Sequence, residues 1–336
     1  MCSGVKNTDV VQAIDLGQDQ ELLNEIYHHE LPPVLNELVE EYQGLENARP
    51  PFMWKWVHKL APYNTLPCVD PKYTGEIPID KTLTILFITL LDDILEKQRD
   101  RATFEEISNI PFEHRSVRKD REDVDSDYTR FAERVWETLV ERIQRGPEYE
   151  AYEELFLYDI KQAINAIEYS DLVIRCPDLA TMRDLEAYES HNMVMFAYAD
   201  IDLMHSPVDM RDELPRLRKA IGVAQQMTRI GNWLSTWERE LQEGDYSSGV
   251  VVYALENGII SLSDLREIEP GRGEKYNRIV KRIKDHDVEE VFLTRWNDYY
   301  NEMHRINDEI TQVDLTPFIE GLEEVLRYHF ASTGLK

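Results

Sequence analysis

The chain has few cysteines, and this shortage excludes two kinds of protein. Only three cysteines occur among the 336 residues, and they are Cys2, Cys68 and Cys176. An odd, sparse and unpatterned set does not make a disulfide framework or a zinc site. We therefore expect a protein of a reducing, cytoplasmic setting.

Basic residues are also scarce relative to acidic ones. The sequence contains 37 Lys and Arg against 65 Asp and Glu, which gives a formal net charge of -28. An acidic surface of this kind repels a phosphate backbone, so nucleic acid is not an expected partner.

Long apolar segments are missing as well. The first 19 residues contain no apolar core of the kind that a signal peptide carries. The longest mainly apolar run, residues 83–91, is interrupted by Thr84 and Thr89. Because this run is far too short to cross a bilayer, we expect no stable membrane insertion.

The pattern of apolar side chains predicts an all-α fold. Apolar residues recur at helical spacing, whereas no alternating run with a hairpin turn is found. The segments expected to be helical are 21–42 with a break at Pro32 and Pro33, 82–99, 128–145, 152–174, 181–204, 214–242, 276–310 and 317–330. The highly charged segment 109–127 is expected to be an exposed loop. The sequence thus predicts one domain over residues 1–336, with about ten helices and a flexible N-terminal segment at 1–20.

The first candidate site is a pair of adjacent aspartates, Asp92 and Asp93, at the end of an apolar helical run. Residues four apart share a helix face, so Asp92 and Glu96 project together with Asp93 alongside. Carboxylates beside a core need a cationic partner, and Mg²⁺ prefers such hard oxygen ligands. The alternative is that this turn has reached solvent and that Lys97 and Arg99 neutralise it.

The second candidate site is a stripe of three oxygen-bearing side chains. Asn232, Thr236 and Glu240 are spaced four residues apart, so they lie along one side of a helix. An amide carbonyl, a hydroxyl and a carboxylate at this spacing can chelate one hard cation. The alternative is a polar stripe on a solvated helix, whose core face would be Trp233 and Trp237.

Together the two motifs resemble the pair found in class I terpene synthases of bacterial and archaeal type. That family has an aspartate-rich motif and, on a later helix, an Asn-x-x-x-Ser/Thr-x-x-x-Glu motif. Here Asn232 follows Asp92 by 140 residues, and the resemblance extends from about residue 82 to residue 328. Two positions depart from the pattern: Glu96 replaces an aspartate, and Trp233 stands where the family usually has Asp. Neither departure removes a metal ligand.

The resemblance implies a helical bundle around a deep apolar cavity, with three Mg²⁺ ions that hold the diphosphate group of a prenyl substrate. The metal ligands would be Asp92, Asp93, Glu96, Asn232, Thr236 and Glu240. The implied reaction is ionisation of a linear C15 farnesyl or C20 geranylgeranyl diphosphate and cyclisation to a terpene hydrocarbon or alcohol, with release of diphosphate. Whether the chain forms a homodimer is left open.

Several basic positions match the family's diphosphate contacts. Arg239 corresponds to the basic residue within the second motif, and Arg327 with Tyr328 resembles an arginine–tyrosine pair near the C-terminus. Guanidinium groups suit phosphate oxygens through bidentate hydrogen bonds. The family's diphosphate sensor is assigned to Arg183, with His191 or Asn192 as alternatives.

Two phenylalanines are expected to line the cavity. Phe87 and Phe196 lie on the helices of the expected site, and ring faces stabilise cations without attacking them. Asp200, Asp202 and His205 are interpreted as a helix end and not as a metal cluster.

Two other functions compete with this one. A chain-elongating prenyltransferase of related fold would need a second aspartate-rich motif where this chain has the stripe at 232–240. A non-catalytic helical interaction protein would not need both metal motifs intact. Release of diphosphate in the presence of Mg²⁺ separates the second alternative from an enzyme.

Overall fold

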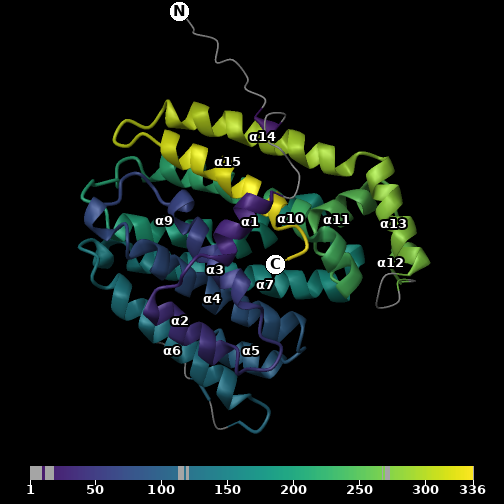
Figure 1. Ribbon diagram of the computed structural model, residues 1–336, viewed down its shortest axis with the longest axis horizontal. Coiled ribbons are helices and arrows are strands. Elements are labelled where there is room, and N and C mark those ends of the chain that lie inside the picture. The colour runs from purple at the N-terminus through teal and green to yellow at the C-terminus, as the bar shows by residue number, and fades with distance from the viewer. Residues whose placement is uncertain are drawn as a thin grey trace, which may run out of the picture.

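The computed structural model describes residues 10–11, 19–112, 117–118, 121–266, 268 and 273–335. Every regular element within these ranges is a helix (Figure 1), which confirms the all-α prediction. Most of the N-terminal segment predicted to be flexible lies outside the described residues. Of the part that is described, Val10 and Val11 are buried against the core.

The order of the helices along the chain is as follows. The α-helices are α1 (Gln20–Tyr27), α2 (Pro33–Tyr42), α3 (Pro51–Leu60), α4 (Ile77–Glu96), α5 (Arg101–Ile107), α6 (Ser126–Ile143), α7 (Tyr149–Arg175), α8 (Met182–Ala187), α9 (Met195–Met204), α10 (Leu214–Glu243), α11 (Gly249–Glu256), α12 (Leu262–Arg266), α13 (Glu274–Asp285), α14 (Val288–Asn307) and α15 (Thr316–Ala331). Short 3₁₀ helices are η2 (Ala61–Asn64), η3 (Pro71–Tyr73), η4 (Pro177–Leu179) and η5 (Glu189–Met193).

Most predicted helices occur close to their expected positions, but two are divided. The segment 181–204 forms α8, η5 and α9, and Val194, whose left-handed backbone has φ 51°, separates η5 from α9. The segment 276–310 is divided into α13 and α14 at Asp287, where φ is 53°. A left-handed residue cannot continue a right-handed helix, and neither position has the glycine that usually signals such a turn. The short helices α3, α5, α11 and α12 were not predicted.

Helix α4 lies in the centre of the bundle. It packs against α3, α6, α7 and α9, and its sequence is apolar on nearly all sides, as is typical of a buried helix. All of its residues are buried except Ile85, Asp92 and Glu96. These three residues therefore mark the side of α4 that no other helix covers.

Helix α10 faces α4 from the other half of the molecule. It begins with Pro215 in its first turn and ends at Gly244, whose φ of 85° stops the helix. It packs against α9, α14 and α15, and α9 also contacts α4 (Figure 1). Helix α9 therefore connects the two halves. Within the described residues, none of the helices combines the length and apolar character that a membrane crossing requires.

A buried ion pair fixes the end of α9 against α4. The ammonium group of Lys81 donates to Asp202 Oδ2 at 2.8 Å and to the carbonyl oxygen of Asn64 at 2.8 Å. Both charged side chains are fully buried, and Asp202 Oδ2 also accepts from the amide of Leu66. His205 caps the same helix by bonding the carbonyl of Ile201. Helix α9 ends at Met204 with His205 at its C-cap, so this segment is the helix end that the sequence indicated, and Lys81 anchors it.

Helix α15 approaches η2 so closely that only glycine fits at one position. A Cβ atom on Gly321 would lie 2.1 Å from the carbonyl oxygen of Tyr63. Asn64, at the end of η2, and His329, on α15, both line the cavity described below. The close contact at Gly321 therefore holds two parts of the cavity wall in place.

We expect Gly321→Ala to lower the free energy of unfolding by about 1–3 kcal/mol, because the added methyl group meets backbone that cannot move aside. Gly75→Ala is the matched control, since a Cβ atom there would have no neighbour within 4 Å; its effect should stay within about 0.5 kcal/mol. Urea denaturation followed by circular dichroism measures both. Equal stability of the two variants would show that α15 and η2 can separate without cost.

Candidate active site

A cavity of about 740 Å³ lies between α4 and α10. Its apolar lining comes mainly from α3, α4, α7 and the region around the break before α9, and consists of Met53, Trp56, Val57, Leu60, Ile85, Ile88, Ile167, Ile174, Met193, Met195, Tyr198 and Val325. Its charged lining consists of Arg49, Asp92, Glu96, Lys97, Arg99, Arg229, Arg239, Glu240, Glu243 and Asp245. On α4 and α10 the carboxylates occupy the C-terminal turns, so one end of the cavity is strongly polar.

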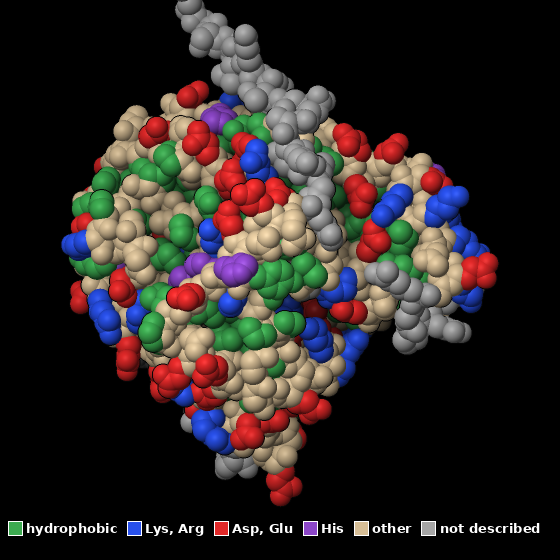
Figure 2. Space-filling model, viewed as in Figure 1, with side chains coloured by type: hydrophobic (Ala, Val, Ile, Leu, Met, Phe, Trp, Pro, Cys, Tyr) green, Lys and Arg blue, Asp and Glu red, His purple; other side chains and the backbone are tan. Residues whose placement is uncertain are grey.

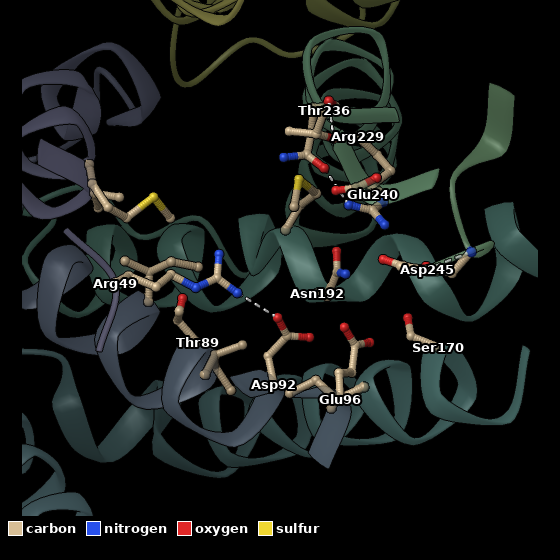
Figure 3. Close-up of a pocket in the computed structure, with 18 of the residues that line it drawn as sticks. Arg49, Thr89, Asp92, Glu96, Ser170, Asn192, Arg229, Thr236, Glu240 and Asp245 are labelled. Carbon is tan, nitrogen blue, oxygen red and sulfur yellow. Dashed lines mark hydrogen bonds and ion pairs between the residues drawn. The ribbon is translucent and has the colours of Figure 1, made fainter. Parts of the chain in front are cut away.

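The first motif is divided between the cavity and the core. Asp92 and Glu96 line the cavity from α4 (Figure 3). Asp93 does not line the cavity, because its side chain is buried. Its carboxylate accepts hydrogen bonds from Arg49 and, at 3.1 Å, from the hydroxyl of Tyr42, and it forms an ion pair with Lys97 at 2.9 Å. The sequence placed Asp93 beside the other two carboxylates, whereas its neighbours hold it on the core side of α4.

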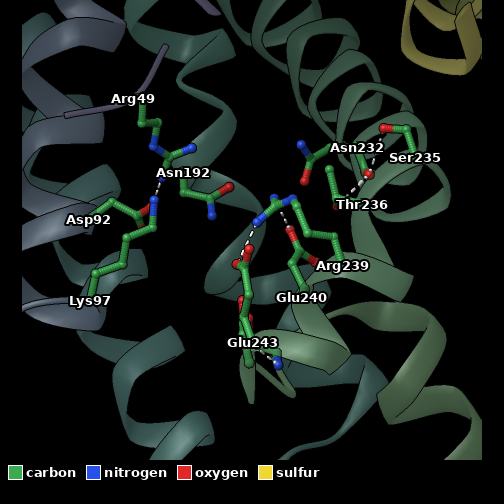
Figure 4. Close-up of polar contacts among 12 residues, drawn as sticks. Arg49, Asp92, Lys97, Asn192, Asn232, Ser235, Thr236, Arg239, Glu240 and Glu243 are labelled. Atoms are coloured by element: carbon green, nitrogen blue, oxygen red, sulfur yellow. Dashed lines mark hydrogen bonds and ion pairs between the residues drawn. The ribbon is translucent and has the colours of Figure 1, made fainter. Parts of the chain in front are cut away.

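Arg49 is a site residue that the sequence did not reveal. It lies in the loop between α2 and α3, and its Nη2 atom is 2.9 Å from Asp92 Oδ2 and 2.8 Å from Asp93 Oδ1. One guanidinium therefore bonds both aspartates. Its contact with Asp92, which lines the cavity, is drawn in Figure 4. No local pattern links residue 49 to residue 92, so only the folded chain shows this contact.

The second motif lines the opposite wall. Asn232, Thr236 and Glu240 all line the cavity from α10 (Figure 4). Thr236 Oγ1 donates to the carbonyl oxygen of Asn232 at 2.8 Å, and Arg229 Nη1 donates to Asn232 Oδ1 at 2.6 Å. Arg229 precedes Asn232 by three residues, so helical spacing could have identified it as a member of the same stripe.

The carboxylates of the two walls destabilise one another's charged forms. Burial raises the pKa of Asp92 to about 6, and burial with the nearby Asp245 raises the pKa of Glu240 to about 7. The pKa of Glu96 is raised by burial and by Asp92, Asp245 and Glu240. Asp93 differs: burial opposes its charge, but Arg49 outweighs burial and its pKa is lowered. For Asp92 and Glu240, the nearby guanidinium groups of Arg49 and Arg239 do not outweigh burial, whereas Asp93 is bonded closely enough by Arg49 and Lys97 to stay ionised.

Asp245 is a further site residue that the sequence did not reveal. It follows the helix-ending Gly244 and lines the cavity near Glu96 and Glu240 (Figure 3). Its Oδ1 atom accepts from the backbone amide of Ser247 at 2.8 Å and from the hydroxyl of that residue at 2.7 Å. In the part of the chain that the structure describes, no three His, Cys, Asp or Glu side chains come together closely enough to share one ion.

Glu189 connects several residues of the cavity wall. It is fully buried in η5, and its carboxylate accepts two hydrogen bonds from Arg229, one of them 2.8 Å long from Nε. It also accepts from Asn192 Nδ2 at 3.0 Å and from Ser170 Oγ at 3.5 Å. Arg229, Asn192 and Ser170 all line the cavity. A single buried carboxylate thus positions side chains from α7, η5 and α10.

The other arginines assigned from the sequence occupy different places. Arg239 lines the cavity, with Nη1 at 2.6 Å from Glu243 and Nη2 at 3.6 Å from Glu240 (Figure 4). Arg183 is exposed on α8 and is not among the residues that line the cavity. Of the two alternatives to Arg183, Asn192 lines the cavity and His191 does not. The assignment of a sensor to Arg183 is therefore not supported by its position.

Arg327 and Tyr328 also lie away from the cavity lining. Arg327 is within 4 Å of Glu323 and Glu324 on its own helix. Tyr328 is buried, and its hydroxyl donates to Glu25 Oε2 at 2.8 Å, which attaches α1 to α15. In this arrangement Tyr328 stabilises the packing of two helices, Arg327 pairs within its own helix, and neither residue lines the cavity.

Neither phenylalanine assigned to the cavity wall lines it. Phe87 is fully buried against Trp136, with ring centroids 5.0 Å apart. Phe196 lies beside the guanidinium of Arg218, at 4.5 Å from the ring centroid. The aromatic rings that do line the cavity are those of Trp56 and Tyr198, together with the imidazole of His329. On α4 the cavity is lined by Ile85, Ile88, Thr89, Asp92 and Glu96, and the turn of about 100° per residue directs Phe87 away from that side.

Comparison with known proteins adds no family to this description. No protein-family model matches the chain, and no curated protein matches it. A function is therefore inferred from the side chains of the cavity and from their arrangement.

We expect Glu189→Gln to destabilise the fold by about 3–5 kcal/mol, because it leaves the buried charge of Arg229 without its partner. Glu186→Gln is a suitable control: Glu186 lies in the same region and pairs with Arg295 at 3.0 Å, but both of these side chains are about a third exposed. Its loss should cost less than about 1 kcal/mol. Chemical denaturation provides the comparison, and a Glu189 variant as stable as the Glu186 variant would contradict the buried contact.

Proposed function

We propose that the chain is a Mg²⁺-dependent class I terpene synthase, which ionises a linear prenyl diphosphate of C15 or C20 length. The observation that carries the proposal is the meeting of two motifs across one cavity. Asp92 and Glu96 on α4 face Asn232, Thr236 and Glu240 on α10, 140 residues later in the chain. The proposal treats the whole chain as one domain that works in a reducing, cytoplasmic setting.

The donor set suits Mg²⁺. Carboxylate, amide and hydroxyl oxygens are the hard ligands that this ion prefers. Asp92, Glu96 and Glu240 have raised pKa values because burial and mutual repulsion oppose their charges, and a divalent cation relieves that repulsion. When bound, Mg²⁺ would neutralise charge on the diphosphate leaving group. We expect three ions, as the resemblance implies, held between the two walls.

Three arginines at the polar end are placed to bind the diphosphate. Arg49, Arg229 and Arg239 line the cavity beside the two motifs. Charge-assisted hydrogen bonds from guanidinium groups stabilise the negative charge that develops on the leaving oxygen. Arg229 is held by Glu189 and Arg49 by Asp93, so these two groups are already oriented before a substrate arrives. Such preorganisation lowers the cost of reorganising the site during ionisation.

The inner part of the cavity is suited to the hydrocarbon chain. Its lining is rich in Ile, Met and Val side chains, which exclude water. The aliphatic Ile and Val side chains also offer no nucleophile to a carbocation. The rings of Trp56 and Tyr198 add electron-rich faces that stabilise a cation. Closure of this apolar chamber over the chain would let its shape select the cyclised product.

The metal motifs provide the first test. With a prenyl diphosphate and Mg²⁺, we expect the chain to release diphosphate, and Asp92→Asn or Asn232→Ala should slow this release by about 100-fold or more. Removal of Mg²⁺ with a chelator should have the same effect on the unaltered chain. Release of diphosphate is followed with a coupled colorimetric assay, and products are identified by mass spectrometry of a hydrocarbon extract.

The control for this test is Asp298→Asn, because Asp298 does not line the cavity. Circular dichroism of each variant verifies that it is folded. Activity that requires an added isopentenyl diphosphate would identify a chain-elongating prenyltransferase instead. Full activity of both motif variants would end the assignment of the two motifs, and a complete lack of turnover with C10 to C25 diphosphates would favour a non-catalytic helical protein.

The aromatic wall provides a further test. Trp56→Leu keeps an apolar side chain but removes the ring face from the cavity, so we expect ionisation to continue while products shift toward earlier-quenched, less cyclised compounds. Phe196→Leu is the control, because Phe196 lies outside the lining. Gas chromatography of both product mixtures decides the matter. If the product mixture changed in Phe196→Leu but not in Trp56→Leu, the carbocation would not lie beside the ring of Trp56.

A further inference from the structure

A second, smaller pocket with basic walls opens beside the main cavity. Its volume is about 490 Å³, and it is lined by Leu95, Arg99, Arg101, Asp171 and Arg175. Three guanidinium groups and one carboxylate give this lining an excess of positive charge, whereas the chain as a whole has a formal charge of -28. Because Glu105 and Glu168 pair with Arg101 from outside the lining, an anionic ligand is favoured here by open N–H donors and not by an excess of charge over the whole neighbourhood.

The carboxylate in the pocket does not occupy all of these guanidinium groups. Arg175 donates to Asp171 from Nε at 3.0 Å and pairs with it through Nη2 at 2.9 Å. Arg99 Nη1 is 3.7 Å from the same carboxylate, which is beyond hydrogen-bonding distance. Each guanidinium offers five N–H donors, and the side chains of Arg99 and Arg175 are 55% and 51% exposed. Donors therefore remain for a ligand.

Arg101 completes the basic wall from the first turn of α5. It bonds Glu105 through Nε at 2.9 Å and Glu168 through Nη2 at 2.7 Å, and both glutamates lie outside the pocket lining. The Arg101 side chain is 50% exposed. The two glutamates thus hold the guanidinium of Arg101, and the exposed part of this side chain lines the pocket.

The two cavities share a wall at the end of α4. Arg99 lines both of them, and Lys97, two residues earlier, lines the main cavity and pairs with Asp93. Arg99 has a left-handed backbone with φ 60°, which is unfavourable for a residue with a side chain and needs support from its surroundings. Basic side chains at positions 97, 99 and 101 therefore form a path from the carboxylate rim to the second pocket.

We propose that this pocket binds inorganic diphosphate, as a station for the leaving group after it moves out of the main cavity. That the diphosphate comes from a reaction in the main cavity rests on the proposed function. That the three arginines bind diphosphate does not. Guanidinium forks match phosphoryl oxygens bidentately, so Arg99, Arg101 and Arg175 can divide two phosphoryl groups among them. A single phosphate reaches fewer of these donors and is bound less tightly.

The test is titration calorimetry of inorganic diphosphate into the full chain, with a chelator present and no added Mg²⁺. All variants carry Arg239→Gln, which removes an arginine of the main cavity from the measurement. Adding Arg101→Gln should weaken diphosphate binding about tenfold, because a charge-assisted contact is lost. The matched control is Arg134→Gln: Arg134 is also about half exposed and is also held by two glutamates, Glu37 and Glu41, but it lines neither cavity.

The control should change the affinity by less than about twofold, since it removes only a surface ion pair. Inorganic phosphate should bind about tenfold more weakly than diphosphate, for want of a second phosphoryl group. Equal affinities for the two anions, no diphosphate binding at all, or equal effects of the Arg101 and Arg134 substitutions would each overturn the proposal. Because the measurement needs neither turnover nor metal, a failure of the proposed enzymatic activity would leave its outcome readable.

Discussion

Helix α4 is enclosed by α3, α6, α7 and α9, and this enclosure determines where the charged residues of the site can lie. Only Ile85, Asp92 and Glu96 escape burial by neighbouring helices, and all three face the cavity. The side chain of Asp93 instead points into the protein core. Its negative charge is stabilised there because Arg49, Lys97 and Tyr42 bond it. Two carboxylates of the first motif, Asp92 and Glu96, therefore line the cavity, whereas Asp93 stabilises the fold.

Charge balance is the second consequence of this enclosure. Carboxylates from α4, α10 and the loop after Gly244 converge on one end of the cavity. The pKa values of Asp92, Glu96 and Glu240 are raised there, because burial and repulsion oppose ionisation. The arginines of the cavity do not cancel this charge fully, since Arg229 is paired with Glu189 and Arg49 is shared between Asp92 and Asp93. The negative charge of the cavity carboxylates is therefore not fully balanced, and divalent cations would balance it.

Local periodicity sufficed to predict an all-helical fold, the shared face of Asp92 and Glu96, and the stripe on α10, but it wrongly set Asp93 beside the two cavity carboxylates. Asn232, Thr236 and Glu240 line the cavity together because residues four apart on a helix share a side. Periodicity could not reveal Arg49 or Trp56, whose positions depend on how α3 and its preceding loop pack against distant helices. It also misplaced Phe87, since an apolar residue on a helix that is buried all round has no preferred side in the sequence alone.

Backbone strain gives an independent indication of where function is located. Among the described residues, the non-glycine positions with positive φ are Asn47, Arg99, Val194 and Asp287. Asn47 and Arg99 line the main cavity, and Val194 lies between its lining residues Met193 and Met195. Each such conformation costs about 1–3 kcal/mol and persists only where the surrounding packing enforces it. Three strained positions at one cavity mean that the fold favours the shape of this site over the local preferences of its backbone, as is expected where binding or chemistry takes place.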